Sequence, residues 1–225
     1  MDKNGDDKMT TDLVPISGAV PALNKSANRQ AIIRSKTYSA GYVPHLDLAA
    51  VSTIADIAGE HPRLGERNKL LIQTLFDGCL RITEALRTRP RDIKQSGAGW
   101  YIEVFGKGSK PGVVAISASL AAQLQAYAYR HKIKPDERLF PFTRARAFQI
   151  VDAAMEKSGI AKPDHVGTVH VLRHSGALER LKITGNPRAV QDQLRHADAR
   201  MTLRYMKTLS SEESIRIQQS VDFQW

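Results

Sequence analysis

The chain has 225 residues, of which 42% are hydrophobic and 25% charged, a composition typical of a globular protein with one good core. Its 33 Lys and Arg against 23 Asp and Glu give a formal net charge of +10, which suits a polyanion such as DNA but equally fits a merely basic, solvated surface. The single cysteine, Cys79, excludes an intramolecular disulfide; the polar N-terminus lacks a secretory signal, and no apolar run approaches the ~18 residues that span a bilayer. We therefore expect a cytoplasmic protein with no membrane partner.

Residues 1–45 mix Asp, Lys, Asn, Ser, Pro and Gly without a sustained apolar period. Such a segment cannot bury enough apolar surface to offset the entropy lost on ordering. The sequence therefore predicts a flexible N-terminal tail over 1–45, a folded domain over 46–208 and a C-terminal tail helix within 209–225.

Apolar residues at helical spacing and helix stop signals predict most of the folded domain as helix. The predicted helices are 46–59, 65–76, 80–86, 118–130, 144–158, 169–181, 187–195, 201–207 and 211–219. Residues 100–105 and 113–116 are rich in β-branched and aromatic residues, and the glycine-rich turn between them predicts a β-hairpin. The expected fold class is mainly α with a small antiparallel β-sheet (α+β).

Six side chains that suit phosphate chemistry follow one another along the chain. They are Arg81, Lys107, His170, Arg173, His196 and Tyr205. Arginines can hold the non-bridging oxygens of a phosphodiester through bidentate, charge-assisted hydrogen bonds. A tyrosine supplies an oxygen nucleophile, and lysine and histidine can move protons. The set therefore contains the parts needed to attack a phosphodiester without a metal ion.

Each of these residues alone has a simpler interpretation. Arg81 can pair with Glu84 three residues along a helix, and a turn lysine such as Lys107 often only aids solubility. His196 near a helix end can act as a partner of the helix dipole, and a lone tyrosine such as Tyr205 is usually a packing residue. The order and spacing of the whole set carry the functional interpretation.

A zinc site is the alternative for the histidines. His170 and His174 are four residues apart, a spacing that suits zinc, and His165 lies nearby. Against it, no carboxylate or cysteine ligand accompanies them, and Arg173 projects from the same helix face, where it would repel a cation. We therefore expect no metal and no other cofactor.

The strings around these residues resemble the motifs of the tyrosine recombinase (phage integrase) family, over most of the chain from about Leu46 to Thr208. Residues 79–84 resemble the family's Gly-Leu-Arg-x-x-Glu box, 106–110 its Gly-Lys-Gly-x-Lys hairpin and 170–174 its His-x-Leu-Arg-His box. Residues 194–196, Leu-Arg-His, resemble its Leu-Gly-His string, and Tyr205 follows nine residues after His196 in a Thr-x-x-Tyr context. Arg195 stands where the family has glycine, which predicts a weaker helix stop.

The resemblance implies which residues bind the scissile phosphate. Arg81 and Arg173 would clamp it from two sides, and His196 would donate a hydrogen bond to it. Glu84 would brace the turn that carries Arg81. Such cations would also stabilise the charge that builds up in the transition state.

The resemblance also implies which residues supply the nucleophile and move protons. Tyr205 would attack the phosphorus and His170 would handle protons near it, while His174 would brace its own helix from within. Lys107 would protonate the leaving 5′ oxygen, with Lys110 as its competitor. A 3′-phosphotyrosyl link conserves the bond energy, so neither ATP nor a metal is required.

The implied function is that of a site-specific DNA recombinase that cleaves and rejoins strands through a covalent 3′-phosphotyrosine. The alternatives are a catalytically silent DNA-binding or regulatory module of the same fold, and a type IB-like topoisomerase. Most family members carry a helical core-binding domain before the first box, and here only a tail precedes it. We therefore expect a catalytic domain alone, or a piece of a longer protein, that binds double-stranded DNA and assembles into a dimer or tetramer on it through the C-terminal tail.

Overall fold

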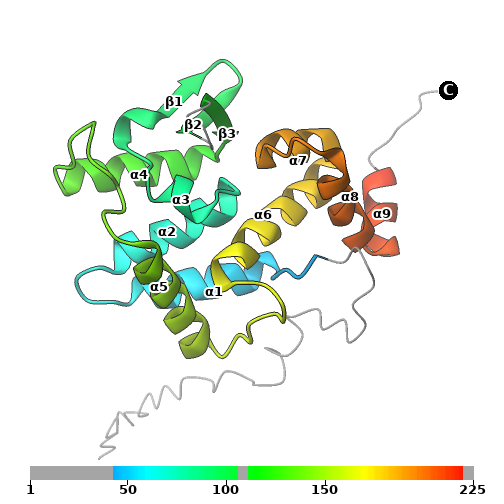
Figure 1. Cartoon of the computed structure of the whole chain (residues 1–225), viewed down its shortest axis with the longest axis horizontal. Coiled ribbons are helices and arrows are strands. Elements are labelled where there is room, and N and C mark those ends of the chain that lie inside the picture. Colours follow the sequence, from blue (N-terminus) through cyan, green and yellow to red (C-terminus); the bar gives the residue numbers. More distant parts are fainter. Residues whose placement is uncertain (1–42, 106–110, 220–225) are drawn as a thin grey trace, which may run out of the picture.

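Helix α6 (Thr168–Thr184) runs through the middle of the molecule, and the other elements pack around it (Figure 1). The computed structural model describes residues 43–105 and 111–219. The predicted turn with Lys107 and Lys110 and residues 1–42 of the tail predicted over 1–45 lie outside these residues. The helices are α1 (Leu48–Gly59), α2 (Gly65–Asp77), α3 (Ile82–Ala85), the 3-10 helix η2 (Pro90–Asp92), α4 (Ala118–Arg130), α5 (Arg144–Ser158), α6, α7 (Pro187–Leu194), α8 (Ala199–Thr208) and α9 (Ser211–Gln218).

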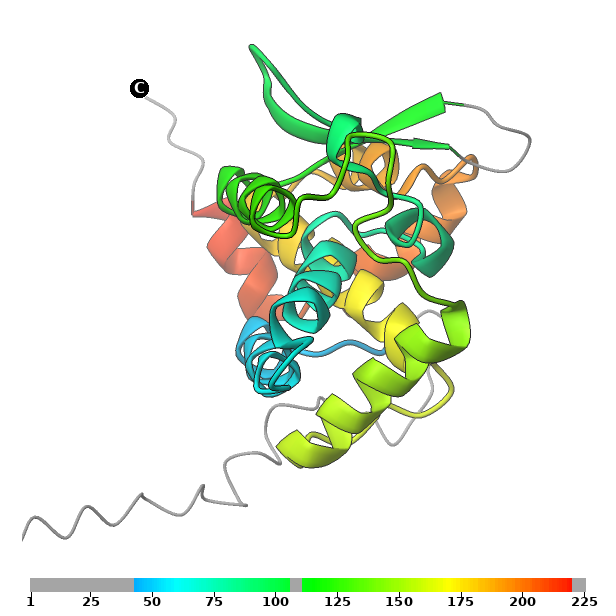
Figure 2. The ribbon, with the colours of Figure 1, turned by 90° about the vertical axis from the view of Figure 1, so that its left-hand side faces the viewer.

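The fold class, helices with one small antiparallel sheet, is confirmed for the described part of the chain. Strands β1 (Ile93–Ser96), β2 (Gly99–Phe105) and β3 (Pro111–Ala115) form a sheet in the order β1-β2-β3. The sheet lies at one end of the molecule, above α4 and α7, and α5 lies at the opposite end (Figure 2). None of the described helices is long and apolar enough to cross a membrane.

The sequence predicted the hairpin of β2 and β3 but missed β1. Strand β1 pairs antiparallel with β2, with Ile93 opposite Ile102. Only Ile93 of its four residues is buried; Lys94, Gln95 and Ser96 are exposed. A single apolar residue gives no alternating pattern, so only the pairing with β2 defines this strand.

Most helix limits lie within a few residues of the prediction, and capping explains the differences. Helix α1 begins at Leu48 instead of residue 46 because the Asp47 carboxylate accepts a hydrogen bond from the Ala50 amide, 2.7 Å away. Residues 43–45, which the sequence places in the tail, are packed against the domain: Val43 and His45 are buried, and the Val43 amide donates to Thr208 Oγ1 over 2.9 Å.

Two hydrophobic clusters are joined through α6. The N-terminal half of α6 packs in the large cluster with α1, α2, α4, α5 and the sheet, through residues such as Leu172. Its C-terminal half packs in a small cluster whose members are Val43, Cys79, Ala177, Leu178, Leu181, Val190, Leu194 and Tyr205. Between the halves, Gly176 lies against α2 so closely that a Cβ there would come within 1.9 Å of the Phe76 carbonyl oxygen. This close approach brings the end of α2 onto the middle of α6.

Candidate active site

The first part of the site is the tight turn between α2 and α3. Cys79 adopts a left-handed backbone conformation with φ 49°, and Arg81 precedes α3 as its N-cap, so this helix begins later than predicted. Glu84 reaches back to the turn: one carboxylate oxygen, Oε2, accepts from the Arg81 amide at 2.9 Å, and Oε1 accepts from Arg81 Nη1 at 3.0 Å. The brace expected of Glu84 is therefore present, and so is the ion pair at i+3.

Arg173 is buried on α6 and binds two separate segments of backbone. Its Nη1 donates to the carbonyl oxygen of Cys79, and its Nη2 donates to that of Leu194 over 2.7 Å. Burial lowers the pKa of Arg173 to about 10, and the charge of Arg81 nearby adds to this lowering. The group remains cationic at neutral pH, and it joins the turn before α3 to the end of α7.

Arg195 ends α7 without the glycine that its family equivalent has. Its backbone adopts the left-handed conformation, with φ 52° and ψ 47°, so the helix stop predicted to be weak is present. A non-glycine residue in this conformation costs roughly 1 kcal/mol. The Arg195 guanidinium contacts Oε1 of Glu84, the same oxygen that binds Arg81. We call Arg81, Arg173 and Arg195, with Glu84, the arginine cluster.

His196 follows directly and faces α8. Its Nδ1 lies 3.3 Å from Thr202 Oγ1, and its carbonyl oxygen accepts from Gln191 Nε2 at 3.2 Å. Burial, followed by the charges of Arg173 and Arg81, lowers the pKa of His196 to about 4. At neutral pH the ring is therefore uncharged and has one N–H to donate.

Tyr205 lies on α8 with its ring in the small hydrophobic cluster and only 2% of its surface exposed. Its Oη is 2.7 Å from His174 Nδ1, and its ring centroid is 6.3 Å from that of His196. Burial raises the pKa of Tyr205 to about 12, although the charge of Arg173 acts in the opposite direction. The side chain is therefore a neutral phenol at physiological pH.

His174 has a contact that the sequence did not suggest. It was expected to brace α6 from within, but its ring bonds across to Tyr205 on α8. Burial, together with the neighbouring His170 and Arg173, lowers the pKa of His174 to about 4. A neutral imidazole beside a neutral phenol forms one hydrogen bond in either direction, depending on the tautomer. No local sequence pattern signals this contact, because the two residues are 31 positions apart.

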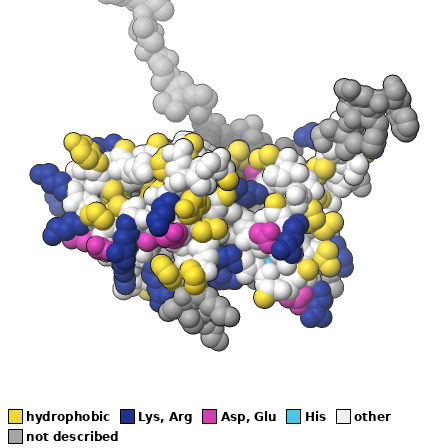
Figure 3. All heavy atoms as spheres, turned by 90° about the horizontal axis from the view of Figure 1, so that it is seen from above, with side chains coloured by type: hydrophobic (Ala, Val, Ile, Leu, Met, Phe, Trp, Pro, Cys, Tyr) yellow, Lys and Arg dark blue, Asp and Glu magenta, His cyan; other side chains and the backbone are white. Residues whose placement is uncertain are grey.

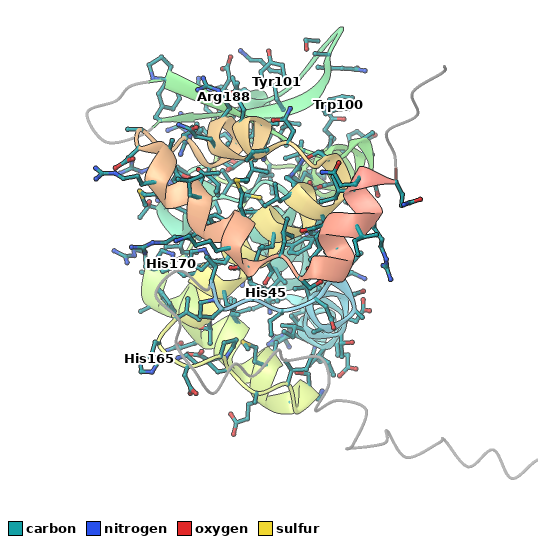
Figure 4. The ribbon with its side chains drawn as sticks, turned by 90° about the vertical axis from the view of Figure 1, so that its right-hand side faces the viewer. His45, Trp100, Tyr101, His165, His170 and Arg188 are labelled. Carbon is teal, nitrogen blue, oxygen red and sulfur yellow. The ribbon has the colours of Figure 1, made fainter. Side chains whose placement is uncertain are left out.

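His170 is exposed on the same helix, with its ring centroid 6.4 Å from that of His174. Partial burial, followed by the charges of Arg173, Arg144 and Arg81, lowers the pKa of His170. His165 lies on the segment before α6, away from His170 in Figure 4. Across residues 43–105 and 111–219, no group of three or more His, Cys, Asp and Glu side chains is placed to hold a metal ion.

The structure thus gathers five of the six predicted catalytic residues around the junction of α3, α6, α7 and α8. They are Arg81, His170, Arg173, His196 and Tyr205. The sixth, Lys107, and its competitor Lys110 lie outside the described residues. Sequence reasoning undervalued two residues: His174, which contacts the nucleophile candidate Tyr205, and Arg195, which contacts Glu84 within the arginine cluster. Cations, neutral imidazoles and a phenol in this arrangement suit attack by tyrosine on a phosphodiester.

The fold and the site define a catalytic domain of the integrase type. The sequence matches the phage integrase family over residues 45–212, three quarters of the chain. The chain belongs to this family of tyrosine recombinases.

Sequence relatives come from several bacteria. The chain is similar to tyrosine recombinase XerC of Nitrobacter winogradskyi, with 33% identity over 71% of this chain and 53% of that protein. XerC of Rhizobium meliloti is 34% identical over 70% of this chain and 50% of that protein. Tyrosine recombinase XerD of Listeria innocua is 28% identical over 71% of this chain and 56% of its own length. The chain therefore spans about half the length of these relatives.

Solved structures show the same fold at lower sequence identity. The XerH site-specific recombinase, bound to a palindromic difH substrate in a post-cleavage complex, has a TM-score of 0.64 and 21% identity over 78% of this chain and 53% of that chain. The catalytic domain of bacteriophage HP1 integrase has a TM-score of 0.58 and 22% identity, over 78% of this chain and 94% of that one. The described residues therefore correspond to one domain of the larger recombinases.

Proposed function

We propose that this chain acts as the catalytic part of a site-specific tyrosine recombinase that cleaves and rejoins double-stranded DNA through a covalent 3′-phosphotyrosine. The observation that supports this most strongly is the meeting of Tyr205, His174, His196 and the arginine cluster at one junction. A protein that only binds DNA has no need for a tyrosine hydroxyl placed among imidazoles and beside buried arginines.

In the proposed reaction, Arg81, Arg173 and His196 bind the non-bridging oxygens of the scissile phosphate. The Tyr205 oxygen forms a bond to phosphorus and gives up its proton to a histidine, His170 in our assignment. The bond to the 5′ oxygen breaks, and this oxygen takes a proton from Lys107. Attack by another 5′ hydroxyl on the phosphotyrosine reverses the sequence and joins a new strand. All roles are filled by side chains, so the reaction needs neither ATP nor a metal ion.

The buried position of Tyr205 indicates that the structure corresponds to a resting state. A phenol with 2% exposure and a pKa of about 12 cannot meet a DNA phosphate unless α8 or its neighbours move. The hydrogen bond to His174 holds the hydroxyl in that position. We propose that DNA binding shifts α8, which brings the hydroxyl to the phosphate while the arginines stay in place.

The partner is double-stranded DNA. The net charge of +10 supports it, and Lys and Arg side chains are spread over the face seen in Figure 3, with fewer Asp and Glu among them. The XerH structure that shares this fold was solved with a palindromic difH substrate, and the structure of the Tn1549 transposon integrase, of similar fold, with a circular intermediate DNA. Affinity should fall steeply with salt, since each phosphate contact releases counterions.

The direct test is incubation with a pool of nicked suicide duplexes that carry a randomised segment, in the presence of EDTA. Covalent adducts are separated on a denaturing gel and their DNA is sequenced to find the preferred site. We expect an adduct that survives EDTA and a defined site. DNA binding without an adduct would favour the silent module, and relaxation of supercoiled DNA of any sequence by a monomer would favour the topoisomerase. Loss of cleavage on chelation, restored by zinc, would favour the metal alternative.

We also propose that the C-terminal tail mediates self-assembly on DNA. Helix α9 packs on its own α6, where Lys182 Nζ lies 2.6 Å from Glu213 Oε1. The ion pair is partly exposed, and Ile217 also packs on Gly185 at the end of α6, but Ser214, Ile215 and Gln218 are exposed, so α9 can be released to dock on a neighbouring copy. A variant that ends at Ser210 should fold and bind a single DNA site but lose synapsis and strand exchange. Normal recombination by this variant would restrict α9 to a cap on its own domain.

A further inference from the structure

Glu84 is a buried carboxylate shared by two arginines. Its side chain is 5% exposed, and Oε1 contacts both Arg81 Nη1, at 3.0 Å, and Arg195 Nη2. The Arg81 side chain is 42% exposed, whereas that of Arg195 is 18% exposed. The open arginine is thus the one that can turn toward a ligand, and the enclosed arginine can stay on Glu84.

The position of Arg195 is fixed from several sides. Its backbone is the left-handed end of α7, and its side chain crosses strand β3 at Gly112, where a Cβ would lie 3.0 Å from Arg195 Cδ. Its Nε is buried, and within the described part of the chain no group accepts a hydrogen bond from it. A strained backbone and an unpaired donor are both unfavourable, so the contact with Glu84 is what offsets them.

Arg81 needs Glu84 for its position but must be able to leave it. A carboxylate that has only Arg81 as a partner would hold the guanidinium away from the phosphate and would itself repel the phosphate. A second arginine on the same oxygen neutralises that charge. Although burial opposes it, the Arg81 amide and the charges of Arg195 and Arg81 keep the pKa of Glu84 below its usual range, so this carboxylate is ionised at neutral pH.

We propose that Arg195 is a positioning residue that neutralises Glu84 and so frees Arg81 to bind the scissile phosphate. The inference rests on the proposed function, because it assigns Arg81 to the phosphate. It also gives a role to the residue at which this chain departs from the glycine of the family string.

The test is a double-variant cycle with two independent measurements. Arg195→Met removes the charge and keeps a long unbranched side chain, without introducing the glycine that would relax the left-handed backbone. Glu84→Gln removes the negative charge but keeps an oxygen that can accept from the Arg81 amide. Wild type, both single variants and the double variant are titrated with inorganic phosphate while the Arg81 Nε–H signal is followed by NMR, after assignment with Arg81→Lys. The same four proteins are assayed for adduct formation on the selected suicide duplex.

We expect Arg195→Met to weaken phosphate binding at Arg81 and to slow adduct formation by about tenfold. In the Glu84→Gln background the same change should have no further effect, because no charge remains to be neutralised. Arg195→Lys should recover part of the loss. The inference would be overturned if Arg195→Met bound phosphate and formed adduct like wild type. It would also be overturned if the double variant lost as much activity as the product of the two single-variant losses.

The two measurements separate this inference from the proposed function. If wild type binds phosphate at Arg81 but forms no adduct, the proposed function fails and the titration alone decides the role of Arg195. If wild type forms the adduct and Arg195→Met behaves like it in both assays, the inference fails and the function stands. Absence of any phosphate shift at Arg81 in wild type contradicts the inference as well.

Discussion

The arginine cluster and the helix that carries Tyr205 are held in different ways. Arg173 is tied to backbone carbonyls of two segments, and Glu84 binds both the amide and the guanidinium of Arg81. This cluster lies at the boundary of the two hydrophobic clusters, since Leu172 beside Arg173 belongs to the large one and Cys79 and Leu194 belong to the small one. Helix α8, in contrast, is held by the small cluster, by packing on α6 and α7, and by single hydrogen bonds to His174, His196 and the Val43 amide. In the proposed mechanism, this difference corresponds to a fixed part that binds the phosphate and a nucleophile that moves with α8.

The largest expected effect comes from removing the hydroxyl of Tyr205. Tyr205→Phe should form no adduct, because no other oxygen nucleophile replaces Oη. It should lose only about 1 kcal/mol of folding free energy, the value of one hydrogen bond to His174. DNA binding, measured by mobility shift, should stay close to wild type. Adduct at the wild-type level would sink the assignment of this tyrosine.

Arg173→Lys tests the fixed half of the comparison. Lysine cannot reproduce the guanidinium fork, so we expect cleavage to fall roughly 10²–10³-fold with a smaller loss of DNA binding. Single-turnover adduct formation and binding should be measured on the same duplex.

Arg180→Lys is the matched control for this variant. Arg180 also lies on α6 and binds the carbonyl of Asp77, at the end of α2, but it is no part of the site. This variant should lose stability yet keep its cleavage rate at a temperature where it is folded. Equal loss of cleavage in both variants would mean that the arginines act only on the fold.

The next effect concerns the pH dependence of stability through His174, the hydrogen-bond partner of Tyr205 on α8. The folded pKa of His174 is about 4, below the ordinary value of 6.5, so the unfolded chain binds a proton more readily. The neutral His174 ring therefore makes its full contribution to the free energy of unfolding above pH 6.5, and this contribution is lost as the pH falls from 6.5 toward 4. The loss from His174 by pH 4 should be on the order of 3 kcal/mol. Urea unfolding of His174→Gln should depend less on pH in this window than wild type, and parallel curves would contradict the assigned shift.

The smallest effect is expected at α9. Glu213→Gln removes a partly exposed ion pair with Lys182, which should change the unfolding free energy by about 0.5 kcal/mol or less. If α9 is easily released, this variant should leave single-site DNA binding unchanged. A loss of several kcal/mol in urea unfolding would show that α9 is a firm part of the domain.

The two halves also differ in what the sequence could predict. Helical periodicity and capping residues located the helices to within a few residues. The family resemblance singled out Arg81 and Arg173 as phosphate ligands, and the structure has Arg173 on α6 as expected but Arg81 just before α3 instead of on it. The comparisons confirmed the family and the fold class. The individual roles of Arg81, His170, Arg173, His196 and Tyr205, and of Lys107, stay predictions. Strand β1 was missed because three of its four residues are exposed and only pairing with β2 defines it.

Contacts between elements distant in the chain could not be read from local pattern. His174 and Tyr205 are 31 residues apart, and nothing in either string shows that the imidazole meets the phenol. Arg195 and Glu84 are 111 residues apart, and a sequence without glycine at position 195 indicated only a weaker helix end. Both contacts depend on the packing of α7 and α8 on α6, which is a property of the whole fold.

The central claim, that Tyr205 attacks the phosphate, is tested most directly by mapping the covalent adduct. The chain is allowed to react with a suicide duplex labelled at the 5′ end of the cleaved strand, and the position of the label is read on a denaturing gel. A second sample is digested with nuclease and protease, and the nucleotide-bearing peptide is sequenced by tandem mass spectrometry. We predict that the 5′ label stays with the protein, that the released strand begins with a 5′ hydroxyl, and that the phosphoryl group lies on Tyr205. A modified residue other than Tyr205, or a label that leaves with the free strand, would contradict the account.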